Sequence, residues 1–390
     1  MKRRSLVIAI LGIAVVATLL LLHSRPRSLD VVWRIEYRRH NATPHMLEVA
    51  PEGRIYALQG GQQKLQVQAY GSDGKPLWLA PVGKGAACNF GAAILSVEES
   101  ELVYVRLLEP QVTAYTLWAT IGRHGEIRWR VVCVGPTDLT PYTTVVPTHK
   151  YVYSTGGSEK DGISYPTAIK MDYTGHRLWK RIETSLAGIS GPAAVDDEGN
   201  LILIGDVGAG VGPFVVKYSP EGERIWKREA EVLDGTRAIW VQADKRGRAY
   251  TIFALHTGIM TESGDDMSGR NQDYVLSTYS PQGKLLSATK LSQGAWLDIV
   301  DAAINGGGEV IAVGNRRKTT LQGYPRGNEN AQLIKCDADG KIAWSRAVKL
   351  PPGNLVHGVR LDDKGGIYLI GSGTKKSDVK GFLYKVADPG

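Results

Sequence analysis

Short apolar runs separated by glycine-centred turns recur along the chain, and this pattern predicts β-strands. One unit places a glycine four residues before a tryptophan, with an apolar or amphipathic residue four positions before the glycine. Such a glycine suits a tight turn with positive φ, so a strand is expected on either side. Gly283 is followed by Ser287 instead. The complete glycine–tryptophan pairs are Gly74 and Trp78, Gly125 and Trp129, Gly175 and Trp179, Gly222 and Trp226, and Gly340 and Trp344.

A second unit alternates with the first. A residue that opens a turn is followed seven positions later by a tyrosine or an isoleucine, as in Val49 and Tyr56. The turns between them include APEGR, DDEGN, DKRGR, NGGGE and DDKGG, which are rich in turn formers. These segments are therefore strand–turn–strand units as well. Each full repeat is predicted to contain four strands, a to d, with tight a–b and c–d turns and a longer b–c connection.

The last repeat is incomplete, and the first residues of the pattern supply the missing piece. The chain ends in LYKVADPG at Gly390, where other copies continue into a fourth strand. The segment VVWRIEY matches that strand and places Trp33 in the tryptophan position. Residues 30–37 are thus expected to complete the blade formed by residues 356–387. Joining the two ends closes a ring and removes open strand edges. The prediction is an all-β fold, a seven-bladed β-propeller over residues 30–390 with four antiparallel strands per blade.

The amino terminus predicts a membrane anchor. Residues 1–5 are basic, and residues 6–22 contain no charge. A helix over 6–22 would span about 25 Å, at the short end of what crosses a bilayer. The basic end favours a cytoplasmic amino terminus, with a linker over 23–29 and an extracytoplasmic propeller, periplasmic in a Gram-negative bacterium. A cleaved secretory signal is the alternative.

Charge and cysteine content narrow the class of protein. Of the net charge of +8, five units come from the basic residues before residue 28. The net charge of the remaining residues, about +3, is too small to predict a surface that binds nucleic acid. Cys88, Cys133 and Cys336 form no CxxC motif, so the cysteines predict neither a metal nor a redox site. Cys336 falls in a core position of the repeat, and a Cys88–Cys133 bridge remains open.

Two phrases carry a family resemblance. KCDADGKIAW resembles the docking motif of quinoprotein-like (PQQ-like) propellers, and FVVKYSPEGERIWKRE is similar to the bacterial propeller repeats called SBBP. The resemblance covers nearly all of residues 30–390 but concerns packing residues, so it implies a fold and not an activity. Quinoprotein dehydrogenases typically have eight blades and a vicinal disulfide. Because the chain has no Cys-Cys pair, no quinone or other cofactor is expected.

Two enlarged b–c segments suggest a binding lip. The distance from the b strand to the turn glycine is 33 residues in blade 5 and 29 in blade 6, against 18 to 22 elsewhere. Long segments in a compact domain often carry function, although tolerated insertion is the alternative. The acidic residues of the blade 5 segment could bind a cation or stay solvated, and the basic residues of the blade 6 segment could face those acids or an acidic ligand. The candidate binding residues are Glu262, Asp265, Asp266, Arg316, Arg317, Tyr324 and Arg326.

A pair of histidines occupies one repeat position in adjacent blades. His45 and His357 each lie eight residues before a turn glycine, on the expected innermost strand of blades 1 and 7. Near a central channel they could bind a metal or handle a proton. Two ligands are half of a metal site, so ordinary packing is the alternative and no metal is predicted.

These observations favour a non-catalytic binding or scaffold module. No GxSxG motif is present, and no set of acid, base and nucleophile converges in the repeats. We expect a membrane-anchored propeller that offers its blade 5–6 loops to a protein or glycan ligand. The alternative is a propeller-channel enzyme, a hydrolase or lyase with or without a metal, that uses His45 and His357.

Overall fold

The computed structural model describes the chain as an all-β protein. The described residues are 29–37, 44–50, 52–61, 64–83, 94–97, 103–108, 115–121, 124–134, 144–148, 150–172, 176–186, 188–207, 213–229, 237–256, 272–291, 297–319, 325–373 and 380–389. Their strands form seven four-stranded antiparallel sheets, which are the blades. The predicted all-β class and the four-stranded repeat are therefore confirmed.

Blades 1 to 3 follow one another along the chain. Blade 1 holds β2 (Pro44–Val49), β3 (Ile55–Gly61), β4 (Lys64–Tyr70) and β5 (Pro76–Gly83). Blade 2 holds β6 (Ile94–Val97), β7 (Val103–Leu108), β8 (Tyr115–Ile121) and β9 (Ile127–Val134). Blade 3 holds β10 (Thr144–Pro147), β11 (Tyr151–Lys160), β12 (Ile163–Asp172) and β13 (Arg177–Ile182).

Blades 4 to 6 are also continuous, whereas blade 7 is not. Blade 4 holds β14 (Gly188–Val195), β15 (Leu201–Val207), β16 (Phe214–Tyr218) and β17 (Arg224–Glu229). Blade 5 holds β18 (Arg237–Ala243), β19 (Ala249–His256), β20 (Gln272–Tyr279) and β21 (Leu285–Lys290). Blade 6 holds β22 (Leu297–Ile304), β23 (Val310–Thr319), β24 (Pro325–Cys336) and β25 (Ile342–Val348). Blade 7 combines β26 (Asn354–Leu361), β27 (Ile367–Gly373) and β28 (Gly381–Val386) with β1 (Val31–Tyr37).

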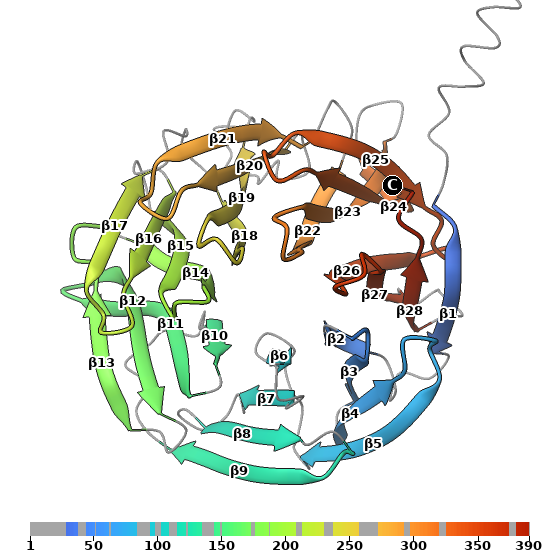
Figure 1. Cartoon of the computed structure of the whole chain (residues 1–390), viewed down its shortest axis with the longest axis horizontal. Helices are drawn as coiled ribbons and strands as arrows, with labels where there is room; N and C mark the ends of the chain where they lie inside the picture. Colours follow the sequence, from blue (N-terminus) through green and yellow to red (C-terminus); the bar gives the residue numbers. More distant parts are fainter. Residues whose placement is uncertain are drawn as a thin grey trace, which may run out of the picture.

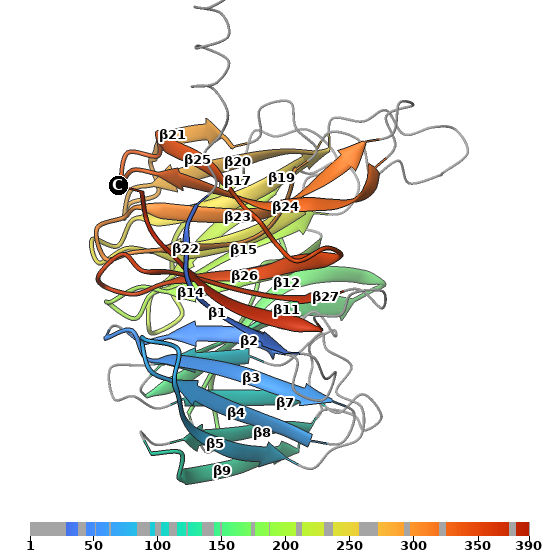
Figure 2. The ribbon, with the colours of Figure 1, turned by 90° about the vertical axis from the view of Figure 1, so that its right-hand side faces the viewer.

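The blades are arranged around a central axis in a closed ring (Figure 1). The first strand of each blade lies innermost, and the fourth lies at the rim. Neighbouring innermost strands contact each other in the order β2, β6, β10, β14, β18, β22, β26 and back to β2. Seen from the side, the ring is a thick disc crossed by the strands (Figure 2).

The two ends of the described chain meet in blade 7, as the split repeat predicted. β1 pairs with β28 in antiparallel register, with Ile35 opposite Leu383 and Tyr37 opposite Gly381. The backbone contact extends past the strand, because the Ala387 amide donates to the Asp30 carbonyl at 3.0 Å. The amide of Leu29 also donates to Ala347 of blade 6 at 2.9 Å. Blade 7 is thus a complete sheet built from segments about 350 residues apart.

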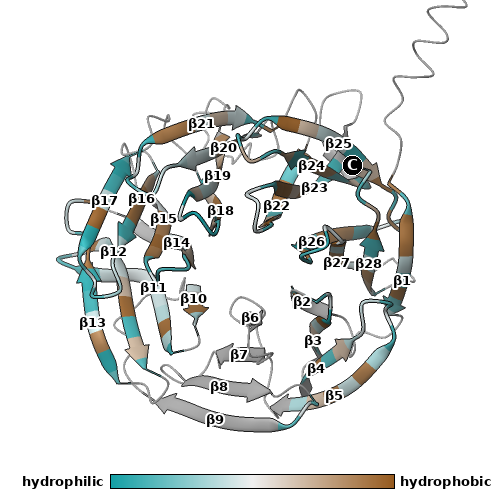
Figure 3. Cartoon of the chain, in the orientation of Figure 1, coloured by the Kyte–Doolittle hydropathy of each residue, from teal (hydrophilic) through white to brown (hydrophobic). Residues whose placement is uncertain are grey.

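An outer-strand bulge aims each tryptophan position at the next blade. In blade 4, Lys217 lies opposite Trp226 and Tyr218 opposite Arg224, so Ile225 is the extra residue of a β-bulge. Trp226 is buried, whereas Ile225 is exposed. In Figure 3, β17 lies at the rim of the ring and carries both hydrophilic and hydrophobic colours. The bulge explains why the tryptophan follows the turn glycine at a fixed spacing.

Four described indoles, those of Trp33, Trp78, Trp179 and Trp226, lie against the turn glycine of the following blade. Trp179 of blade 3 contacts the turn of Gly222, where a Cβ atom would lie 2.9 Å from the indole Cδ2. Gly222 has a φ of 83°, so both the turn and the packing require glycine. The Trp179 Nε1 donates to the carbonyl of Pro220 at 3.0 Å. These tryptophans, which were predicted as structural repeat residues, therefore hold neighbouring blades together through contacts with the c–d turns. The side chain of Trp129 lies outside the described residues.

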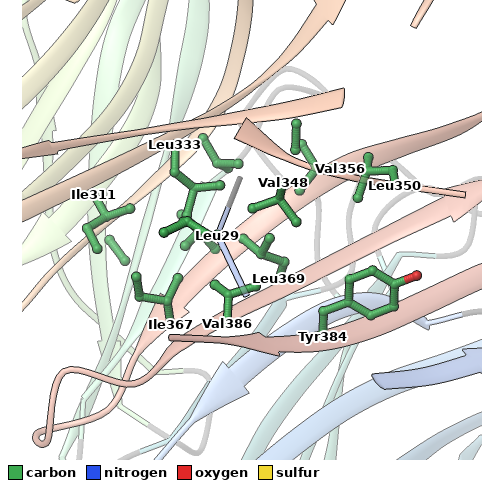
Figure 4. Packing of buried hydrophobic residues seen from close by; sticks show 14 of the residues in the cluster. Leu29, Ile311, Leu333, Val348, Leu350, Val356, Ile367, Leu369, Tyr384 and Val386 are labelled. Carbon is green, nitrogen blue, oxygen red and sulfur yellow. The ribbon is translucent and has the colours of Figure 1, made fainter. Parts of the chain in front are cut away.

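Apolar side chains fill the spaces between blades. Between blades 6 and 7, the cluster in Figure 4 includes Leu333, Val356, Leu369 and Tyr384, all buried. Leu29, which precedes β1, belongs to the same cluster. Burial of one such side chain contributes about 1.5–3 kcal/mol, so the segment before β1 also stabilises the ring.

Two b–c hairpins are longer than the repeat predicts. β11 and β12 pair without a break from Tyr151 to Lys160, and Asp161 and Gly162 close the turn, both with positive φ. An Asp-Gly pair is the typical sequence of such a two-residue turn. In blade 6, β23 and β24 extend to Thr319 and Pro325. The blade 6 insertion is therefore at least partly a strand pair.

The predicted anchor over residues 6–22, its basic end and residues 23–28 of the predicted linker lie outside the described residues. The last residue of that linker, Leu29, is instead buried between blades 6 and 7. Across the described ranges, no helix is long and apolar enough to cross a membrane.

Candidate functional site

Five of the innermost strands carry a β-bulge at the same repeat position. In blade 7, Val356 lies opposite Gly371 and Gly358 opposite Ile370, which makes His357 the bulged residue. In blade 1 the bulged residue is His45. The two histidines singled out in the sequence therefore share one backbone geometry. Bulges re-aim a side chain and are frequent beside binding sites. The side chain of His45 lies outside the described residues.

His357 is exposed and has a hydroxyl partner. Its Nε2 lies 2.5 Å from the Oγ of Ser372 on β27. The contact joins the innermost strand to its neighbour within blade 7. A neutral imidazole can donate or accept in such a contact, and a hydroxyl can do both. The pair can therefore bind a polar ligand group or transfer a proton.

Blade 6 holds the backbone beside this histidine. Asn315 on β23 is 4% exposed, and its side chain makes two bonds to Val356. Its Nδ2 donates to the Val356 carbonyl at 2.9 Å, and its Oδ1 accepts from the Val356 amide at 2.9 Å. The bulge of His357 is therefore fixed from the adjacent blade. Arg316, the next residue of β23, is exposed.

A charged cluster spans three innermost strands near this position. The Nε of Arg360 on β26 lies 2.8 Å from Glu48 on β2, and its Nη1 lies 2.7 Å from Asp301 on β22. Asp301 also accepts from the Val359 amide at 3.1 Å. All three side chains are partly buried, at 27%, 22% and 19% exposure. The cluster ties blades 6, 7 and 1 together around the axis.

The electrostatics of the cluster favour the charge of Arg360 but oppose that of Glu48. Burial opposes the charge of Arg360, but Glu48 and Asp301 outweigh it and raise the pKa of the guanidinium. Burial also raises the pKa of the Glu48 carboxyl, and the attraction of Arg360 only partly offsets this. Sequence reasoning missed the cluster because its three members lie in three different blades, and their contacts depend on how the blades pack.

The predicted lip is only partly described. Glu262, Asp265, Asp266 and Tyr324 lie outside the described residues. Arg317 and Arg326 belong to the paired strands β23 and β24, and only their backbone is described. The structure therefore places Arg316 and His357 on neighbouring strands of blades 6 and 7, with Arg316 on the opposite face of β23 from Asn315.

A separate cavity lies between blades 7 and 1. It has a volume of about 410 Å³ and lies where the c–d turn of blade 7 is interrupted by the chain ends. Its charged lining mixes Glu52, Asp362 and Asp388 with Lys364 and Lys385. Asp362 already accepts a 2.7 Å bond from Tyr368, so the lining is largely engaged in structural contacts.

The described residues contain no group of three or more histidine, cysteine or acidic side chains placed to hold a metal. Cys336 is buried in the core between blades 5 and 6, as its repeat position predicted. Burial raises the pKa of its thiol to about 12. The Cys88–Cys133 bridge falls on residues whose side chains are not described.

Comparison with solved structures identifies the fold. A catalytically inactive histidine-to-alanine variant of virginiamycin B lyase from Staphylococcus aureus, with quinupristin, matches with a TM-score of 0.56 and 8% identity, over 91% of this chain and 99% of that one. The selenomethionine form of the same lyase matches with a TM-score of 0.55 and 9% identity, over 91% and 99%. A europium-containing methanol dehydrogenase matches with a TM-score of 0.43 and 13% identity, over 92% and 93%.

The chain is therefore a β-propeller, and at these identities the likeness concerns the fold alone. No protein-family model matches the chain, and no curated protein sequence matches it.

Proposed function

We propose that the chain is a non-catalytic binding module, anchored to a membrane by residues 6–22, with its propeller outside the cytoplasm. Its ligand is a protein or glycan that carries acidic groups. The ligand contacts the blade 6 hairpin and the adjacent mouth of the channel. The proposal depends on one observation, the fixation of the His357 bulge by Asn315 at the base of that hairpin.

The chemistry of the described side chains supports an acidic ligand. Arg316 and His357 are exposed, and the Ser372 hydroxyl lies beside the imidazole. Guanidinium, imidazolium and hydroxyl groups all donate to carboxylates. Because the backbone of His357 is held from two blades, little ordering is required on binding.

Binding of defined acidic polymers to the full chain in detergent tests the proposal. Fluorescence anisotropy would compare labelled poly-glutamate and polygalacturonate with neutral dextran. We expect one acidic polymer to bind and to weaken at least tenfold in Arg316→Glu and in His357→Ala. Lys284→Glu and His124→Ala are matched controls, since both residues are exposed in turns of other blades. Equal binding by all four variants would refute the proposed site.

The contact between His357 and Ser372 also favours a second candidate, a channel hydrolase or lyase. A lyase is among the solved structures of this fold. In that case the imidazole would accept a proton from the hydroxyl or from a substrate. Hydrolysis of nitrophenyl esters and a metal analysis of the purified chain distinguish the two. An ester rate that disappears in both His357→Ala and Ser372→Ala, but persists in His124→Ala, would replace the binding module with an enzyme.

A further inference from the structure

The joints between blades share one acceptor carbonyl, two residues before the turn glycine of the c–d turn. Trp33 Nε1 donates to Ser72 at 3.1 Å between blades 7 and 1. Trp226 Nε1 donates to Pro281 at 2.8 Å between blades 4 and 5. Together with Trp179 and Pro220, these bonds define the usual joint of the described blades.

The joint between blades 5 and 6 has a different donor. Ser287 occupies the tryptophan position, and its Oγ would lie 2.6 Å from a Cβ placed on Gly340. The equivalent acceptor is the carbonyl of Ala338, and Arg248 Nη1 donates to it at 3.0 Å. Arg248 Nε is bound to Asp244 Oδ2 at 2.6 Å. A guanidinium from blade 5 has therefore taken over the hydrogen bond of the missing indole.

Three polar atoms at this joint are buried without a hydrogen-bond partner among the described residues. They are Ser287 Oγ, Thr278 Oγ1 and Arg248 Nη2. Thr278 is 1% exposed and lies directly opposite Ser287 across β20 and β21, and opposite Tyr250 across β19 and β20. Its Oγ1 would also lie 3.7 Å from a Cβ on Gly340, so it faces the same turn. Buried polar groups are nearly always paired, with protein or with ordered water.

We propose that the joint between blades 5 and 6 is a buried hydration site, in which ordered water bridges Ser287, Thr278 and Arg248. Ser287 is smaller than the tryptophan found at this repeat position in other blades, and a water molecule needs two to four polar partners. The site is neutral, because Asp244 offsets the charge of Arg248, so water suits it better than an anion. The hydrated joint lies between the two blades that carry the enlarged b–c segments.

The sign of a stability change tests this proposal. Ser287→Ala and Thr278→Val each remove one partner of the bound water, so the melting temperature of the full chain is expected to fall by a few degrees. If the joint is dry, removal of an unpaired hydroxyl raises the melting temperature instead, and the proposal fails. Thr251→Val is the matched control, since its hydroxyl is buried and unpaired in the described part of the same blade but lies outside the joint.

A crystal structure at high resolution provides the second readout. It should show water within hydrogen-bond distance of at least two of Ser287 Oγ, Thr278 Oγ1 and Arg248 Nη2. In Ser287→Trp, the indole is expected to displace that water. Direct bonds between these side chains with no water between them would overturn the proposal, whatever the melting temperatures.

Discussion

Blade 4 and blade 7 reach the same four-stranded sheet by different routes. Blade 4 is one continuous segment, and its outer strand β17 follows β16 after a single turn. Blade 7 takes its outer strand β1 from the other end of the chain. Both outer strands present a tryptophan to the next blade, Trp226 to Pro281 and Trp33 to Ser72. The repeat therefore specifies the contact between each tryptophan and the next blade. Closure of the ring depends on the pairing of β1 with β28, which are not joined by a turn.

Blade 7 is also held by polar side-chain contacts with both neighbouring blades. Arg360 binds acids of both neighbouring blades, and Asn315 holds the backbone of β26 from blade 6. Lys335 of blade 6 pairs with Asp388, just beyond β28, at 2.8 Å. Trp344 of blade 6 is buried, but its Nε1 has no partner among the described residues. In blade 7, the strands β28 and β1 are not consecutive in the chain, so no c–d turn joins them. Side-chain contacts across the blades thus replace a missing turn.

The largest predicted effect comes from removing β1. Deletion of residues 1–37 exposes the edge of β28 and removes Trp33 and Leu29 from two joints. We expect loss of most of the ~5–15 kcal/mol that typically stabilises a domain, and therefore loss of cooperative thermal unfolding. A synthetic peptide of residues 29–37 should restore it, and the same peptide with Trp33→Ala should do so less well. Unchanged unfolding of the deleted chain would contradict the closed ring.

Single tryptophan replacements test whether the tryptophans of blades 4 and 7 contribute equally to stability. Trp226→Ala is expected to cost about 3–5 kcal/mol of unfolding free energy, as usual for a buried aromatic residue. Trp33→Ala should fall at the lower end of that range, because Trp33 is only partly buried. Chemical denaturation measures both. A loss of less than about 1 kcal/mol of unfolding free energy in Trp33→Ala would show that the tryptophan of β1 does not stabilise the contact with blade 1.

The hairpins of both blades could be predicted from the sequence, because turns depend on local sequence. A positive-φ glycine and the tryptophan four residues later identify a c–d hairpin wherever they occur. The matching phrases at the two ends therefore predicted blade 7. The contact of each indole with the turn of the next blade was not predictable, since it depends on how the blades pack in the ring. The contacts of Arg248 with Ala338 and of Arg360 with Glu48 and Asp301 were missed for the same reason, because they cross between blades. The Asp161-Gly162 turn was a local signal for the long blade 3 hairpin.

Replacement of Arg360 tests the contacts special to blade 7. Arg360→Met leaves Glu48 and Asp301 without their cation, and we expect a loss of up to about 3 kcal/mol at pH 7. The folded-state pKa of Glu48 is raised by burial, so its contribution to stability is present at low pH and lost as pH rises through that pKa. The deficit of the variant should therefore shrink toward pH 4. Lys75→Met, which removes an exposed ion pair with Asp73, should change stability little at either pH.

The smallest effect concerns Cys336, which lies in the continuous part of the ring. Because burial raises the pKa of this thiol to about 12, it should not react with an aromatic disulfide reagent at pH 8 in the folded protein. Cys336→Ser should leave the number of fast-reacting thiols unchanged in buffer and lower it by one in denaturant. Fewer fast thiols in buffer would mean that the core between blades 5 and 6 is accessible.

A cross-link between the ends tests ring closure most directly. Ile35 and Leu383 face each other across β1 and β28, and paired residues of antiparallel strands have Cα atoms about 4.5–5.5 Å apart, within reach of a disulfide. Ile35→Cys with Leu383→Cys is expected to form that disulfide on mild oxidation, identified by mass spectrometry of the joined peptides. Ile35→Cys with Ile370→Cys should not, because Ile370 lies one strand further, about 10 Å away. Failure of the first pair to cross-link, or equal cross-linking of both, would contradict the closed ring.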